Sequence, residues 1–107
     1  MTAAQVQPTA DGLRLEGEVT YLNADELSGA GIALLKSRHG PDPARVDLAA
    51  VVDPGTIVVA LLLSWYRELQ PRGVQLALAN VPGPLRRILQ FTGVMKVLES
   101  DFNGDGR

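Results

Sequence analysis

The chain has 107 residues, which suits one domain with one hydrophobic core. Its formal net charge of −2 excludes a broad electrostatic attraction to nucleic acid or to an anionic membrane surface. The absence of cysteine excludes a disulfide framework and thiolate chemistry, in keeping with a reducing compartment. The N-terminus lacks the basic start and apolar core of a secretory signal, and the longest apolar run, 57–63, is too short to span a bilayer. We therefore expect a cytoplasmic, single-domain protein without membrane insertion.

The first part of the chain predicts a strand followed by a helix. Residues 1–11 are small and polar, which is typical of a flexible lead. Apolar and polar side chains alternate along "LRLEGEVT", which is the period of a half-buried strand or hairpin. A helix is predicted over 23–38, with Asn23 as N-cap, Glu26 at the third helical position and Gly40 at its end. The expected inward stripe of this helix consists of Leu27, Ala30, Leu34 and Leu35.

The remaining sequence predicts alternating strands and helices. "RVDLAAVV" is typical of a short buried strand, and a helix over 56–70 follows it. "VQLALAN" predicts a third strand, and a short helix over 84–92 precedes Gly93 as its C-cap. "VMKVL" can add an edge strand before a polar tail over 99–107. This order predicts an α/β fold with helices mainly on one face of the sheet.

The predicted helix over 56–70 is apolar on two faces. One stripe suffices to dock the helix on a sheet and consists of Val58, Leu61, Leu62, Trp65 and Leu69. The opposite face is apolar over its first two turns, where a solvated helix would present Lys, Glu or Gln. Another element of this chain could cover that face, but contiguous exposed apolar surface is typical of an interaction site. We therefore favour a partner-binding face. Its candidate residues are Thr56, Val59, Ala60, Leu63, Tyr66 and Arg67.

Thr56 stands at the start of this helix, and its hydroxyl has three interpretations. It could cap the helix, or lie beside a cap made by Asp53 with Pro54 at the first helical position. It could instead accept a phosphate, which would gain from the positive end of the helix. It could also contact the partner at the head of the apolar face. A cap and a contact are compatible, so the sequence leaves these roles open.

No catalytic or metal-binding constellation can be assembled from the sequence. His39, the only histidine, lies in a predicted turn without a nucleophile beside it, and Asp47 is a lone carboxylate next to a strand. Arg86 and Arg87 open the last predicted helix without an accompanying glycine-rich phosphate loop. The tail "DFNGDGR" matches only the first half of a calcium loop and lacks its bidentate glutamate. We therefore predict a non-enzymatic protein with no metal or cofactor of its own.

The segment "RVDLAAVVDPGTIVVALLLSWYRELQPRGVQLALANVP" resembles the central block of STAS domains, the anti-sigma-factor-antagonist fold, and most closely its MlaB type. In that family a strand ends in Asp-Ser/Thr and leads into Gly-Leu-Ala-Leu-Leu-Leu on a helix. Here the hydroxyl position falls on Thr56 and "ALLL" on residues 60–63. The position of the motif aspartate is Gly55, and the nearest carboxylate, Asp53, lies two residues earlier. The resemblance covers most of residues 12–98 and implies a STAS domain with a mixed sheet.

This resemblance implies a non-catalytic subunit of a bacterial Mla-type phospholipid ABC transporter, a lipid-transport system that serves outer-membrane lipid asymmetry. Such a subunit would bind the cytoplasmic ATPase subunit and stabilise or regulate it, in a complex with permease and substrate-binding subunits. It would be cytoplasmic and reach the inner membrane only through its partner. The alternative is an anti-sigma-factor antagonist regulated by phosphorylation of Thr56. The replacement of the motif aspartate by Gly55 and the apolar helix face favour the transporter subunit.

Overall fold

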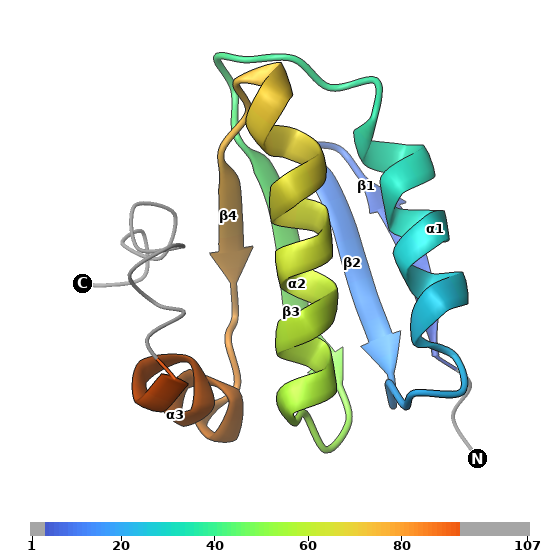
Figure 1. The fold of residues 1–107 in the computed structure, drawn as a ribbon, viewed down its shortest axis with the longest axis vertical. Helices are drawn as coiled ribbons and strands as arrows, with labels where there is room; N and C mark the ends of the chain where they lie inside the picture. The colour runs from blue at the N-terminus through green and yellow to red at the C-terminus, as the bar shows by residue number, and fades with distance from the viewer. Residues whose placement is uncertain (1–3, 93–107) are drawn as a thin grey trace.

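A computed structural model describes residues 4–92, which form a four-stranded sheet and three α-helices (Figure 1). The strands are β1 (Gln5–Thr9), β2 (Gly12–Gly17), β3 (Ala44–Val51) and β4 (Leu76–Ala79). The helices are α1 (Ala24–Leu35), α2 (Thr56–Leu69) and α3 (Gly83–Thr92), and a short 3-10 helix, η1 (Gln70–Arg72), extends α2. The predicted α/β class is confirmed, and each helix lies within two or three residues of its expected bounds.

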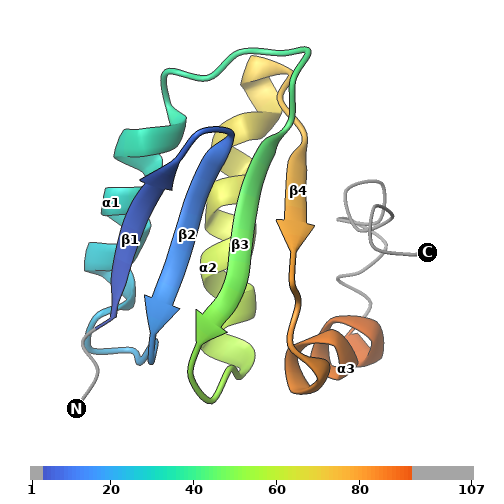
Figure 2. The same ribbon diagram turned by 180° about the vertical axis from the view of Figure 1, so that it is seen from behind.

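The sheet has the order β1-β2-β3-β4 and is mixed. β1 and β2 form an antiparallel hairpin, whereas β2, β3 and β4 run parallel to one another. Helices α1 and α2 connect the parallel strands and lie against the same face of the sheet. Figure 2 shows the sheet from behind, where no helix of the described chain lies over the strands. Helices mainly on one face of a mixed sheet are therefore confirmed.

The N-terminal segment differs from the expected flexible lead over 1–11. Its residues Gln5–Thr9 form β1, with Gln5 opposite Glu16 on β2. The Gln5 amide donates a hydrogen bond of 2.8 Å to Glu16 Oε1. β1 is an edge strand, and Val6 is its one aliphatic side chain that packs against the core. An edge strand of this kind satisfies its backbone through one neighbour and needs little apolar sequence, so periodicity gave no signal.

The core lies between the sheet and the helices. All five residues of the predicted inward stripe of α2 are buried, which confirms that stripe. They pack with the inward side chains of β2 and β3, of which Leu13, Leu15, Val46 and Leu48 have no exposed surface. Alternate residues of these strands, such as Arg14 and Arg45, point to the open face and are exposed. This alternation is the period of a strand that is buried on one side only.

Helix α1 packs tightly against α2 at a glycine. The predicted stripe of α1 is confirmed at Leu27 and Leu35, and Leu34 is partly buried against the core. Ala30, by contrast, is exposed, and Gly31 is buried in its place. A Cβ atom built on Gly31 would overlap the indole ring of Trp65. The predicted stripe is wrong at Ala30, because a pattern of apolar residues favours alanine over glycine for a buried position. The tight contact with Trp65, however, requires a residue without a side chain.

We expect Gly31→Ala to destabilise the domain by about 1–3 kcal/mol, because the added methyl overpacks a filled contact with Trp65. Gly29→Ala is the matched control on the same helix, since a Cβ there would meet nothing within 4 Å. It should stabilise the domain by about 0.8–1 kcal/mol through helix propensity alone. Urea unfolding of both variants measures the difference. Equal stabilisation by the two alanines would contradict the close packing.

The turn before α1 also departs from expectation. Asn23 precedes the helix as predicted, but its side chain makes no capping hydrogen bond. Instead its Oδ1 accepts the backbone N–H of Thr20 over 2.8 Å, and its Nδ2 donates to the carbonyl of Glu18 over 3.1 Å. Asn23 therefore builds the β2–α1 turn rather than the helix end, a competition to which asparagine is prone.

Three predictions fall outside the described residues: the C-cap Gly93, the edge strand "VMKVL" and the polar tail 99–107 with its partial calcium loop. None of the helices within residues 4–92 combines the length and the hydrophobicity that a membrane-spanning segment requires.

Candidate partner-binding site

Helix α2 begins at Thr56 and has Gly55 as its N-cap residue. Gly55 is extended, with φ −139° and ψ −162°, and no side chain of the described chain caps this helix. The interpretation of Thr56 or Asp53 as the cap is therefore wrong. Thr56 occupies the first helical position with an exposed side chain, so its hydroxyl stays available for a phosphate or for a partner. The preceding loop turns at Asp53, whose φ of +46° lies in the left-handed region that aspartate tolerates.

The six candidate residues of α2 do not share one exposure. The exposed members are Thr56, Ala60 and Arg67, which lie on one side of the helix. Leu63 and Tyr66 are half-buried and pack against the core. Val59 is only 7% exposed and belongs to the core. The expectation that all six form an exposed face is wrong at Val59, because the chain itself covers part of the extra apolar surface.

Helix α3 lies on the side of α2 that carries Val59. Ile57 faces α1, because it lines a groove between the two helices. Val59 follows two residues later, and two residues of an α-helix turn by about 200°, so Val59 lies on the side of α2 away from α1. Helix α3 packs with α2 on the side away from α1 (Figure 1). Leu85 and Leu89 of α3 are fully buried and, four residues apart, share one face of that helix. The pattern of α2 alone could not reveal this cover, because α3 is a separate helix further along the chain.

A shallow groove of about 160 Å³ runs between α1 and α2 beside the exposed residues. Its lining consists of Ala24, Asp25, Ser28, Ile57, Ala60, Leu61 and Ser64. The hydroxyls of Ser28 and Ser64 form a hydrogen bond of 2.8 Å across it. Small side chains on both helices leave this space open, and Ala60 connects it to the exposed side of α2. We define the exposed stripe as Thr56, Ala60 and Arg67 together with this groove. The stripe can receive an apolar side chain from a partner protein.

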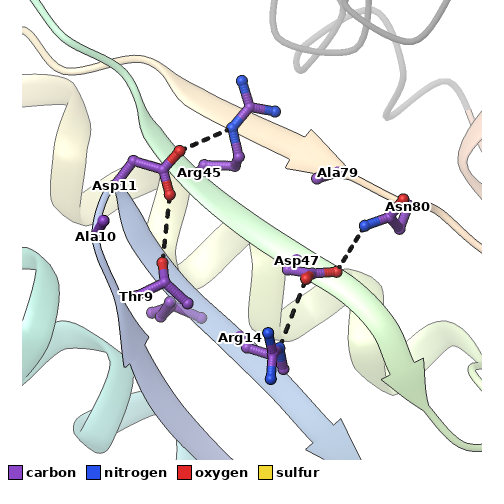
Figure 3. Close-up of a pocket in the computed structure, with 9 residues that line it drawn as sticks. Thr9, Ala10, Asp11, Arg14, Arg45, Asp47, Ala79 and Asn80 are labelled. Carbon is purple, nitrogen blue, oxygen red and sulfur yellow. Dashed lines mark hydrogen bonds and ion pairs between the residues drawn. The ribbon is translucent and has the colours of Figure 1, made fainter.

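A second depression, about 540 Å³, lies on the open face of the sheet (Figure 3). At its centre Asp47 accepts a hydrogen bond of 3.0 Å from Asn80 Nδ2 and lies 3.6 Å from Arg14 Nε. Arg45 pairs separately with Asp11 at 3.2 Å. The four charged groups thus form two ion pairs: Arg14 with Asp47 between β2 and β3, and Arg45 with Asp11 between β3 and the hairpin turn. Asp47, which the sequence presented as a lone carboxylate, joins β2 and β3 to the end of β4.

The pKa of Asp47 lies below its ordinary value of 3.8, because the amide of Asn80, the backbone N–H of Ala49 and the charge of Arg14 favour the carboxylate over the opposing effect of partial burial. The folded protein therefore binds this proton less tightly than the unfolded chain does. The stabilising contribution is present above the unfolded pKa of 3.8 and is lost as the pH falls through the lower folded pKa.

The wild-type domain should lose stability as the pH falls from about 6 to about 3. We expect this loss to be smaller in Asp47→Asn, because the variant lacks the carboxylate that takes up the proton. Thermal melts across this range measure the loss. Asp42→Asn, at an exposed carboxylate in the α1–β3 connection, is the control and should retain the wild-type dependence. A profile for Asp47→Asn as steep as that of the wild type would contradict the role of this carboxylate.

Comparison with known families gives one match. The model of a family described as "Mlab, STAS domain" matches residues 2–99, which include all the described strands and helices. The comparison with curated proteins gives no match.

Proposed function

The chain belongs to the STAS domain family, and on this basis we propose that it is a non-catalytic subunit of a bacterial Mla-type phospholipid ABC transporter. Its partner is the cytoplasmic ATPase subunit, which it binds and stabilises or regulates. The ATP site belongs to that partner, so this chain needs no cofactor of its own. The permease and substrate-binding subunits complete the complex, and the chain is cytoplasmic and held at the inner membrane through the ATPase.

The observation that carries this proposal is the exposed stripe of α2. Thr56 and Ala60 are exposed beside the groove, and Leu63 continues the apolar surface as a half-buried neighbour. Arg67 is the first charged residue of α2, so the helix has no charge over its first three turns. A helix surface of this kind is suited to a dry protein contact.

The second candidate is an anti-sigma-factor antagonist regulated by phosphorylation of Thr56. The observation in its favour is the exposed, uncapped Thr56 at the first turn of α2, where free backbone N–H groups would stabilise a phosphate. The replacement of the motif aspartate by Gly55 and the description of the matching family favour the transporter subunit instead.

The test is binding to each candidate partner. The chain is co-expressed with the ATPase subunit encoded beside a lipid-transport permease in the same genome, and separately with a kinase-like anti-sigma factor. Co-elution with the ATPase on size exclusion, and a binding isotherm with the purified subunit, support the proposal. Binding to the anti-sigma factor alone, with loss of binding after phosphorylation of Thr56, would replace the proposal by the second candidate.

A further inference from the structure

Two large apolar side chains stand exposed in the turn that joins β2 to α1. Tyr21 is 83% exposed and Leu22 is 86% exposed. Among the described residues the other large apolar side chain with this status is Val52, at 41%, in the β3–α2 loop. Both loops leave the same end of the sheet, because Gly17 of β2 pairs with Val51 of β3 (Figures 1 and 2). The exposed apolar side chains therefore lie at the end of the domain where α2 begins.

The backbone of the turn that carries them is ordered by hydrogen bonds. The backbone N–H of Leu22 donates to Thr20 Oγ1 over 3.2 Å, and the N–H groups of Asn23 and Ala24 donate to the Thr20 carbonyl over 3.2 and 2.9 Å. The Asn23 side chain closes the turn through its bond to the N–H of Thr20. A turn ordered in this way loses little conformational entropy on binding, and its apolar side chains gain free energy when a partner removes them from water.

The charged residues of this turn, of the first part of α1 and of the neighbouring β3–α2 loop are all acidic. Residues 18–35 contain Glu18, Asp25 and Glu26 and no lysine or arginine, and residues 48–66 contain only Asp53. All four carboxylates are exposed. These carboxylates repel an anionic lipid surface and the same turn of a second copy, whereas they attract a basic protein surface.

We propose that Tyr21 and Leu22, which we call the apolar turn, insert into an apolar pocket of a partner protein whose rim carries lysine or arginine side chains. The identity of that partner as the ATPase subunit rests on the proposed function. The apolar turn then forms a second anchor at the same end of the domain as Thr56. Tyrosine is enriched among the few buried side chains that dominate binding free energy at protein interfaces, and the leucine beside it adds buried apolar area.

The experiment measures the Kd of the full chain for the purified ATPase subunit. The double variant Tyr21→Ser with Leu22→Ser should bind about tenfold to a hundredfold more weakly, because two buried anchors are lost. Its melting temperature should equal that of the wild type, since both side chains are exposed. His39→Ser, which removes an exposed ring from the α1–β3 connection at the opposite end of the domain, should bind like the wild type.

A charge arm tests the basic rim. Glu18→Lys should weaken binding severalfold at low salt and flatten its salt dependence, whereas Asp42→Lys, at the opposite end, should change neither.

The outcomes separate this proposal from the proposed function. If the double variant binds with wild-type affinity while Ala60→Glu on α2 loses binding, the role of the apolar turn is overturned and the proposed function stands. A wild-type chain that does not bind the ATPase would overturn the proposed function and this partner with it. If the wild type dimerises and the double variant does not, the turn binds a second copy and the proposal is overturned. If the wild type floats with phosphatidylglycerol vesicles and the double variant does not, the turn binds lipid, which overturns the proposal as well.

Discussion

The Ala60→Glu variant is expected to lose affinity for the ATPase subunit by about two orders of magnitude while its melting temperature stays unchanged. Ala60 is exposed on α2 and lines the groove toward α1, so the substitution leaves the core intact. At a dry contact the new carboxylate must lose its water without gaining a counter-ion, which costs several kcal/mol. A loss of about 2.7 kcal/mol already corresponds to a hundredfold change in Kd.

Ala33→Glu is the matched control, because Ala33 is an exposed alanine within α1 and receives the same change in charge and volume. Its Kd should equal that of the wild type. Thr56→Arg should weaken binding as Ala60→Glu does, whereas Thr56→Ser should be neutral. Leu63→Glu is a poorer probe, since Leu63 is half-buried and a charge there also disturbs the core. Unchanged affinity in Ala60→Glu would show that the partner binds elsewhere.

Trp65→Ala is expected to lower the free energy of unfolding by about 3–5 kcal/mol. The indole is fully buried, lies against the backbone of Gly31 and donates its N–H to the carbonyl of Ser28 over 3.1 Å. Its removal leaves a cavity between α1, α2 and the sheet, and it leaves a partly buried carbonyl without its donor. Urea unfolding of the isolated chain measures this change.

Two controls separate the parts of this effect. Trp65→Phe keeps much of the apolar volume but not the indole N–H, so it should cost less than Trp65→Ala. Tyr21→Ala removes an aromatic ring from a position that is 83% exposed, and it should change stability by no more than about 0.5 kcal/mol. If Trp65→Ala costs no more than Tyr21→Ala, the tryptophan does not support the contact between the two helices.

The sequence by itself was sufficient for the three helices, for β2, β3 and β4, and for the inward side of α2 and β2. Along α2 the period of 3.6 identified every residue of the buried stripe around Trp65, and the alternation in β2 separated Leu13 and Leu15 from Arg14. The strand–helix order and the motif around Thr56 predicted the α/β fold, its mixed sheet and the family. These features are local, because the residues that define them lie within a few turns or a few strand positions of one another.

Only the tertiary structure decided which of the remaining surfaces are covered. Val59 is buried on the side of α2 where α3 packs, Gly31 is buried because Trp65 crosses α1 at that point, and β1 forms from polar residues because β2 pairs with it. Periodicity specifies which side chains share a face. Whether that face meets water, a helix or a partner depends on elements that are distant in the chain, so Tyr21 and Leu22 could be recognised as exposed only once the turn before α1 was in place.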